Sequence, residues 1–382
     1  MNMFSSVMVA ILGVSPAIAS VLSSRAVPNN TLPSGTNPIK VSSAQFLGNL
    51  TADNSCSHRD LGFSGPINGV WYHIFGDTIW CDTGVTDPNL DPGYGPDGVP
   101  GGFVPFVRDS ISQSTSNPLK VHDLHLNDNT PVPHQNQFVP YDKSFGEAVD
   151  TGFGGTSLCE TNATAGEAAF FYLVAPNGAP SKGAGVARIS TAFGTPTVEA
   201  RFGSQGYWWD AKTSPRYGDQ AAYRDTQGDY IYAWGGAPLS ATGEATRYVY
   251  QTRVLATQAF DLTKYQYWYG RATGWKTTPL TTFNEETAVM AGAGQGQVVY
   301  SNYYKTYLFV HTDLFHVLIR TAPKPEGPWS ADVIAWTPTK FYSAGYIYAG
   351  VAHPYLDTSG KTLTVSYTNN PNVNDVVKIT FA

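Results

Sequence analysis

Short apolar and aromatic runs alternate with polar residues along the whole chain, and Gly, Pro, Asn or Asp interrupt them at short intervals. This spacing predicts antiparallel strands joined by tight turns. Strand-rich blocks recur at residues 69–78, 167–190, 228–254, 297–322 and 346–382. Because each block reads as a self-contained antiparallel sheet, the pattern favours an all-β fold, a β-propeller of about five blades. A jelly roll or a parallel β-helix stays open as an alternative.

The first block contains the clearest turn signal of the sequence. Asn68-Gly69 suits a two-residue type I′ turn, which needs positive φ at both central positions. With this dipeptide at the tip of a hairpin, paired residues have numbers that sum to 137, so Asp60 faces Asp77. Directly opposed side chains share one face of a sheet, and two carboxylates that close acquire different pKa values. The register therefore predicts an acid/base pair.

Structural explanations of both aspartates remain open. Three residues between the turn and the aspartates could introduce a bulge or shift the register: Gly62, Gly65 and Pro66. Asp77 could cap a turn, and Asp60 could pair with Arg59 or Arg108.

The same register bears on the cysteines. Cys56 faces Cys81, which predicts a disulfide and leaves Cys159 as a free thiol.

Residues 1–19 have the apolar core and the Ala-x-Ala site of a secretory signal peptide. We expect an N-terminal extension at 20–45, a propeller domain at 46–382 and an extracellular, monomeric protein without a membrane span. Sequons for glycosylation lie at Asn29, Asn49 and Asn162.

Composition narrows the classes of partner. The chain has 38 Gly, 26 Pro, 13% aromatic and only 14% charged residues, which agrees with many short strands and turns. A net charge of −6, without any run of Lys or Arg, argues against nucleic acid as a partner. Motifs for a nucleophilic serine, a zinc protease, a phosphate-binding loop or paired CxxC zinc sites are absent from the sequence. We expect no cofactor and no metal, although a structural Ca²⁺ held by loop oxygens stays open.

Aromatic and polar residues elsewhere suggest how a sugar could be held. In a propeller, polar residues near the innermost strands of successive blades converge on one channel, and aromatic faces suit the apolar faces of sugar rings. The candidate substrate-binding residues are Arg59, Trp80, Trp208, Trp209, Asp219, Glu286 and His353. For each of them a structural role in the core, a turn or a strand end is the alternative.

Several short motifs resemble one protein family. The order RD, HIFGDT, GPW at residues 327–329 and AHPYL…LTVSYTNN resembles secreted five-bladed propellers of the glycosidase type, most closely the domain-of-unknown-function family 4185. Some members of that family are endo-D-arabinanases. Their proposed catalytic aspartates lie in the first blade, and the resemblance maps them onto Asp60 and Asp77. The loop at residues 82–108 does not align with the family.

The sequence thus predicts a secreted glycoside hydrolase that uses Asp60 and Asp77, one as the acid and the other as the base or nucleophile. The expected substrate is a polysaccharide or glycan, and the family resemblance adds an arabinan as a candidate. Inverting and retaining mechanisms both stay open, because a bulge would change the separation of the carboxylates. The main alternative is a non-catalytic, lectin-like carbohydrate-binding propeller, and a polysaccharide lyase is a third.

Overall fold

The computed structural model describes Leu32 and residues 35–91, 106–127, 133–176, 179–340, 345–369 and 372–382. It is nearly all-β, and five sheets form a five-bladed β-propeller, as the sequence predicted. The sequons and motifs that fall before residue 32, namely the signal peptide at 1–19 and Asn29, lie outside the described residues.

The blades follow one another along the chain. Blade 1 consists of β2 (Thr51–Ala52), β3 (Ser57–Ile67), β4 (Val70–Trp80), β5 (Phe106–Val107), β6 (Ser110–Ser114) and β7 (Lys120–Asp123). Blade 2 consists of β10 (Gly155–Asn162), β11 (Glu167–Val174), β12 (Gly183–Ser190), β13 (Thr197–Arg201) and β14 (Trp209–Asp210). A separate pair, β8 (Leu126–Asn127) and β9 (His134–Gln135), lies between them in the sequence.

Blade 3 consists of β15 (Ala221–Asp225), β16 (Tyr230–Gly236), β17 (Tyr248–Leu255), β18 (Gln266–Trp268), β19 (Trp275–Lys276) and β20 (Met290–Ala291). Blade 4 consists of β21 (Gln297–Ser301), β22 (Thr306–Thr312), β23 (Val317–Ala322) and β24 (Val333–Trp336). Blade 5 consists of β25 (Ile347–His353), β26 (Thr362–Asn369), β27 (Val373–Phe381) and β1 (Val41–Asn49).

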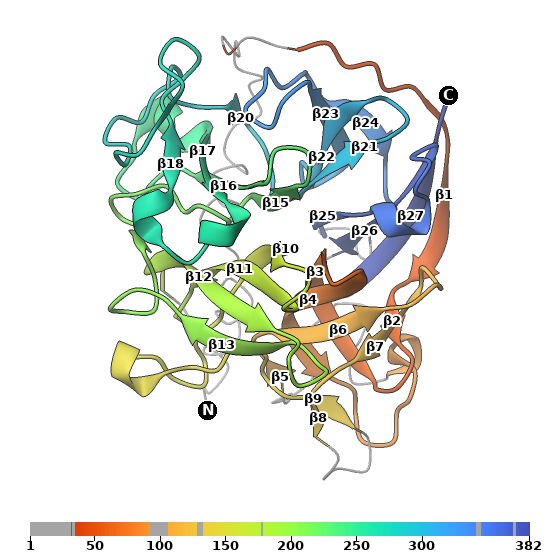
Figure 1. Cartoon of the computed structure of the whole chain (residues 1–382). Coiled ribbons are helices and arrows are strands. Elements are labelled where there is room, and N and C mark those ends of the chain that lie inside the picture. The colour runs from red at the N-terminus through yellow and green to blue at the C-terminus, as the bar shows by residue number, and fades with distance from the viewer. Residues whose placement is uncertain are drawn as a thin grey trace, which may run out of the picture.

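The innermost strands form a closed ring around the propeller axis. Strand β3 contacts β10, β10 contacts β15, β15 contacts β21, β21 contacts β25, and β25 contacts β3 (Figure 1). The middle of the ring is packed tightly, because the Gln297 side-chain amide donates to the Ser64 carbonyl 3.0 Å away, across the axis from blade 4 to blade 1. A Cβ at Gly65 would collide with the Leu158 carbonyl, so this close approach of β3 to β10 requires glycine.

The last blade is completed by the N-terminal strand. Strand β1 pairs with β27 along its length, and Figure 1 shows the red β1 beside the blue β27. Strand β1 begins at Val41, before residue 46, where the sequence placed the start of the propeller domain. The first and last strands of the chain therefore close the ring through one sheet.

The predicted hairpin register is present in blade 1. Asn68 and Gly69 both have positive φ, at 50° and 78°, and most partners on β3 and β4 have numbers that sum to 137. Among the described residues, no helix has the length and apolar character needed to cross a membrane.

Candidate active site

The hairpin departs from regular pairing at the first of the two aspartates. The register shifts between Arg59 and Leu61 and again between Leu61 and Phe63, so Asp60 has no direct partner on β4. Leu61 and Gly62 have φ values of 62° and 93°, which marks the bulge that the sequence allowed near Gly62. The bulge turns Asp60 out of the ladder.

The carboxylate of Asp60 lies between blades 1 and 5. Its Oδ2 accepts a hydrogen bond of 2.8 Å from the hydroxyl of Tyr348, which comes near the start of β25. Its Oδ1 has no hydrogen-bond partner among the residues that the structure describes. That oxygen lies where a Cβ at Gly76 would be, so glycine at this position makes room for the carboxylate.

The surroundings of Asp60 favour its protonated form. Burial, and then the negative charge of Asp77, raise the pKa of Asp60 to about 8, although the Tyr348 hydrogen bond opposes them. A carboxyl that keeps its proton at neutral pH can act as a general acid.

Asp77 has a cation beside it. Arg108 Nη1 lies 3.4 Å from Asp77 Oδ1, and the Arg108 guanidinium also stacks 4.6 Å above the ring of Phe106. Burial raises the pKa of Asp77 above its ordinary value, and the charge of Arg108 offsets only part of that rise. The Asp77 side chain is 32% exposed, whereas the Arg108 side chain is only 8% exposed. The buried arginine therefore contacts the Asp77 carboxylate and leaves it accessible to solvent. The Asn372 side-chain amide donates to the Asp77 backbone carbonyl, 3.0 Å away.

Of the two arginines considered as partners of Asp60, neither is its ion-pair partner. Arg108 pairs with Asp77, while Arg59 makes a bidentate pair with Asp123, at 2.8 and 2.9 Å. Arg59 is also 2% exposed and stacks on the ring of Phe75. This burial argues against contact between Arg59 and a substrate, and that role stays an untested prediction. The Arg59–Asp123 ion pair joins strands β3 and β7 of blade 1.

Three other predicted binding residues are buried. Asp219 forms an ion pair with Arg216 at 2.7 Å, and its other oxygen accepts from the Gly236 backbone. Trp209 packs in the core, where its indole N–H donates to the Tyr267 hydroxyl. His353 donates or accepts a 2.8 Å hydrogen bond with Ser366, and burial lowers its pKa well below the usual range. None has more than 4% of its surface exposed, which argues against contact with a substrate, and a role in binding stays an untested prediction for all three.

Trp80, Trp208 and Glu286 have surface available, but the structure does not gather them with the aspartates into one contact network. Trp80 stands three residues from Asp77 on β4, and an odd separation places side chains on opposite faces of a strand. Its ring stacks on His134 at a centroid distance of 3.6 Å. Trp208 is half-buried against Tyr265, and Glu286 is exposed. Their role in binding stays a prediction.

Sequence reasoning missed Tyr348 and Gly76 as members of the site. Tyr348 lies 288 residues from Asp60 along the chain, and no local pattern reports such a contact. The available signal was the expected convergence of polar residues at the inner strands. It singled out His353 on β25 but not Tyr348, which lies on the same strand. Gly76 stood inside the quoted HIFGDT motif.

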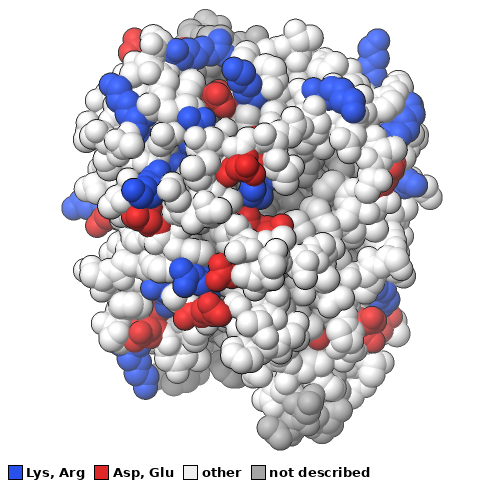
Figure 2. Space-filling model, in the orientation of Figure 1, with Lys and Arg blue, Asp and Glu red and all other residues white. Residues whose placement is uncertain are grey.

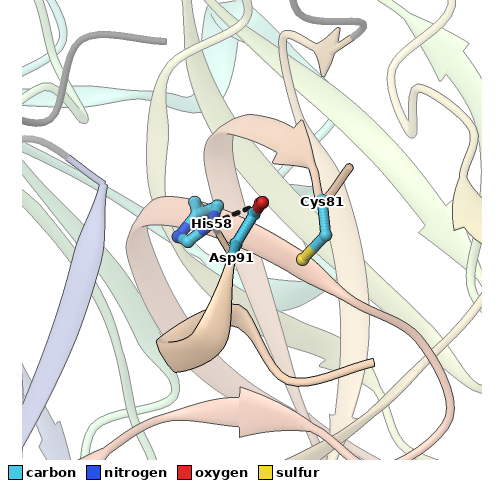
Figure 3. Close-up of side chains that lie close together, drawn as sticks. All are labelled: His58, Cys81 and Asp91. Atoms are coloured by element: carbon cyan, nitrogen blue, oxygen red, sulfur yellow. Dashed lines mark hydrogen bonds and ion pairs between the residues drawn. The ribbon is translucent and has the colours of Figure 1, made fainter. Parts of the chain in front are cut away.

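A possible metal cluster lies beside the hairpin ends. The ligand atoms of His58, Cys81 and Asp91 lie within 4.8 Å of one another, and His58 Nε2 is 3.1 Å from Asp91 Oδ2 (Figure 3). However, Cys81 is bonded to Cys56, with an S–S distance of 2.02 Å, and a disulfide sulfur is not a thiolate ligand. The predicted disulfide is confirmed, and Cys159 is free and buried, where burial raises the pKa of its thiol.

The two described sequons differ in accessibility. The Asn49 amide donates to Asp375 Oδ1 at 2.7 Å, a bond that a glycan on the same nitrogen would disturb. Asn162 is exposed, at the end of β10. Glycosylation remains a prediction, and of these two positions the structure favours Asn162.

The surface around the propeller axis agrees with an uncharged ligand. Figure 2 shows Lys and Arg scattered over this face among uncharged residues, with acidic side chains beside a hollow near the centre. Among the described residues on this face, cations do not gather into a broad patch of the kind that nucleic acid requires.

These features define a five-bladed propeller with a carboxylate pair on the first two strands of its first blade, beside the last blade. Residues 190–374 match a family described as a domain of unknown function, DUF4185. The resemblance inferred from short motifs is thus confirmed over that segment, which contains GPW and AHPYL but neither Asp60 nor Asp77. The endo-D-arabinanase activity of some relatives stays a prediction for this chain.

One solved structure shares the fold at low sequence identity, and two others are less similar. A protein of Bacteroides ovatus ATCC 8483, provisionally named a hydrolase, superimposes with a TM-score of 0.57 at 16% identity, covering 85% of this chain and 86% of that one. An exo-β-1,3-galactanase of Phanerochaete chrysosporium has a TM-score of 0.49 at 11% identity, covering 88% of this chain and 64% of that one. A family 117 glycoside hydrolase of Zobellia galactanivorans has a TM-score of 0.45 at 13% identity, covering 88% and 90%. Among curated proteins, none matches the sequence.

Proposed function

We propose that the protein is a secreted glycoside hydrolase in which Asp60 is the general acid and Asp77 the base or nucleophile. The observation that carries the proposal is the asymmetric pair itself. Asp60 has an oxygen without a partner and a raised pKa, whereas Asp77 has Arg108 beside it and is partly exposed. Two carboxyl groups in such different surroundings suit the two roles that glycosidic hydrolysis needs.

The chemistry follows from these surroundings. Asp60 gives its proton to the glycosidic oxygen as the bond to the sugar's anomeric carbon breaks. Asp77 either removes a proton from a water that attacks the anomeric carbon, or attacks that carbon itself to form a glycosyl–enzyme ester. In the second case a water that gives its proton to the Asp60 carboxylate then attacks the anomeric carbon, which releases the sugar and restores both aspartates. The positive charge that develops on the sugar ring is stabilised by the Asp77 carboxylate, and the charge of Arg108 beside it favours the ionised form of that carboxylate and holds it in place.

The substrate in this proposal is a neutral glycan, with an arabinan as the first one to test. Tyr348 holds Asp60 from blade 5, so a sugar bound at the pair would contact the first and last blades together. The family resemblance supplies the arabinan, and the residues of the site do not distinguish it from other neutral glycans.

The test is the release of reducing ends from a panel of glycans by the wild type, Asp60→Asn and Asp77→Asn. We expect each variant to fold and to lose at least ~10²-fold in kcat, because each lacks a group that acts in the transition state. Asp53→Asn, on the exposed surface of blade 1, is the matched control and should keep full activity. Near-wild-type turnover in both site variants would refute the assignment. Glycan binding by the wild type without any turnover would instead support a non-catalytic propeller.

A further inference from the structure

A second hollow lies at the other end of the inner strands. It is a pocket of about 590 Å³ between blades 1, 4 and 5. Its wall includes residues 69–71 at the tip of the β3–β4 hairpin, whereas Asp60 stands near the start of β3. At ~3.3 Å per residue of strand, the tip is roughly 25–30 Å from Asp60. The pocket is therefore separate from the carboxylate pair, and its volume falls within the ~300–1,000 Å³ usual for ligand sites.

The lining combines aromatic rings with hydroxyl and amide groups. Trp71 and Tyr355 are half-buried, with ring centroids 4.9 Å apart, and Tyr300 is also part of the wall. The polar lining residues include Ser114, Thr115, Ser116, Ser301, Asn302 and Thr358. Among the described residues that line the pocket, there is no Lys, Arg or His.

The one carboxylate in the lining already has partners. Asp357 accepts hydrogen bonds from the backbone and hydroxyl groups of Ser359 and Thr362, at 2.6 to 3.0 Å. These neutral donors stabilise the turn between β25 and β26 and occupy both Asp357 oxygens, while the carboxylate keeps its negative charge and so disfavours an anionic ligand. The lining thus suits a ligand that is uncharged, rich in hydroxyl groups and equipped with an apolar face.

The aromatic wall is held in place from behind. His73 Nδ1 lies 3.1 Å from the Gly62 carbonyl, an acceptor, so Nδ1 carries the proton and Nε2 accepts from the Tyr355 hydroxyl 3.2 Å away. His73 is 1% exposed, and burial lowers its pKa to about 4, which keeps the imidazole neutral and this tautomer in place. Tyr355 therefore has a fixed orientation, and a fixed ring loses little entropy when a ligand stacks on it.

We propose that this pocket is a second, non-catalytic site that binds one neutral sugar unit of a saccharide chain, stacked on Trp71 and Tyr355. A phosphate, a uronic acid or another anionic ligand is disfavoured, since the described lining residues include no cation. The proposal concerns binding alone and holds whether or not the carboxylate pair hydrolyses glycans. Its position at the opposite end of the inner strands lets the protein hold one stretch of a polysaccharide while another reaches the carboxylate pair.

The experiment titrates Asp60→Asn with neutral trisaccharides by calorimetry: 1,5-linked arabinotriose, β-1,3-galactotriose and cellotriose, with trigalacturonate as the charged probe. We expect at least one neutral trisaccharide to bind in the pocket and trigalacturonate not to bind there. Adding Trp71→Ala should weaken that binding at least ~10-fold, because stacking on an aromatic ring supplies much of the contact. Phe193→Ala, which removes an aromatic ring that is 89% exposed and outside the pocket, is the matched control and should leave binding unchanged.

A second variant keeps the test decisive if Trp71→Ala lowers the thermal midpoint. Ser116→Trp places a large side chain at an exposed position of the lining, where it fills the pocket without disturbing the core, and should weaken the same binding event. Introduced separately into the wild-type protein, neither Trp71→Ala nor Ser116→Trp should change the turnover of a short soluble substrate, so failure of the hydrolase proposal and failure of this one are distinguishable. The proposal is overturned if no neutral trisaccharide binds, or if its affinity is the same in Trp71→Ala, Ser116→Trp and their parent.

Discussion

At the scale of single residues, the absence of a side chain at position 76 gives Asp60 its place. The Asp60 oxygen without a hydrogen-bond partner occupies the space that a Cβ at Gly76 would need. Gly76 lies on β4 directly before Asp77, so one strand supplies both a carboxylate and the gap for the other. A sequence comparison of charged residues alone would overlook this contribution.

Gly76→Ala should therefore displace the Asp60 carboxylate without removing any charged group. We expect kcat to fall by ~10-fold or more, because small misplacements of a reacting group are costly, while the pH at which activity is lost also shifts. Gly154→Ala is the matched control, since a Cβ at that glycine meets no atom within 4 Å. Equal activity of the two alanine variants on the same glycan would contradict this role of Gly76.

The raised pKa of Asp60 also predicts how stability depends on pH. The folded protein holds this proton up to about pH 8, whereas an unfolded aspartate releases it near ~3.9. Between those values the folded state binds more protons than the unfolded state, so this group makes the free energy of unfolding fall as the pH rises. Asp60→Asn removes the effect, and its thermal midpoint should gain on the wild type from pH 4 to pH 8. A constant difference in midpoint over that range would show that Asp60 is not protonated in the folded protein.

At the scale of elements, the β3–β4 hairpin shows what local sequence can and cannot predict. The Asn68-Gly69 turn fixed the register, and with it the Cys56–Cys81 disulfide, because turn geometry and strand pairing act over a few residues. The sequence did not decide whether a bulge lies near Asp60, because nothing local signals that a leucine such as Leu61 adopts a positive φ. The partner of Asp60 was not predictable at all, because it comes from blade 5.

The burial of two candidate binding residues was not predictable for a related reason. Arg59 and Asp219 are ionisable residues near inner strands, and the sequence could not show that each has an opposite charge close by in the fold. Arg216, the partner of Asp219, is three residues away, but Asp123, the partner of Arg59, comes from the outermost part of blade 1. Burial of paired charges in structural roles competes with function at every such position.

At the scale of the whole molecule, five recurring blocks predicted five blades, but the closure of the ring was not predicted. Strand β1 supplies the fourth strand of the last sheet, and its segment VSSAQFLGN is mostly exposed or half-buried. An edge strand of this kind has a weak hydrophobic pattern, so no local signal separated it from the extension expected at 20–45. Strand β1 joins the two ends of the chain by pairing with β27.

This closure gives a prediction for two truncated proteins, one starting at Val41 and one starting at Leu50. The first keeps β1 and its pairing from Val41 with Phe381 to Asn49 with Asp375, whereas the second leaves β27 as an open edge. At ~1 kcal/mol net for each lost hydrogen bond, removal of β1 should cost several kcal/mol and lower the thermal midpoint by ~10 °C or more. An open β27 edge should also promote aggregation on heating, which light scattering would record together with the melt. The protein starting at Val41 serves as the control for loss of the preceding residues, and equal midpoints of the two truncated proteins would show that β1 does not close the ring in solution.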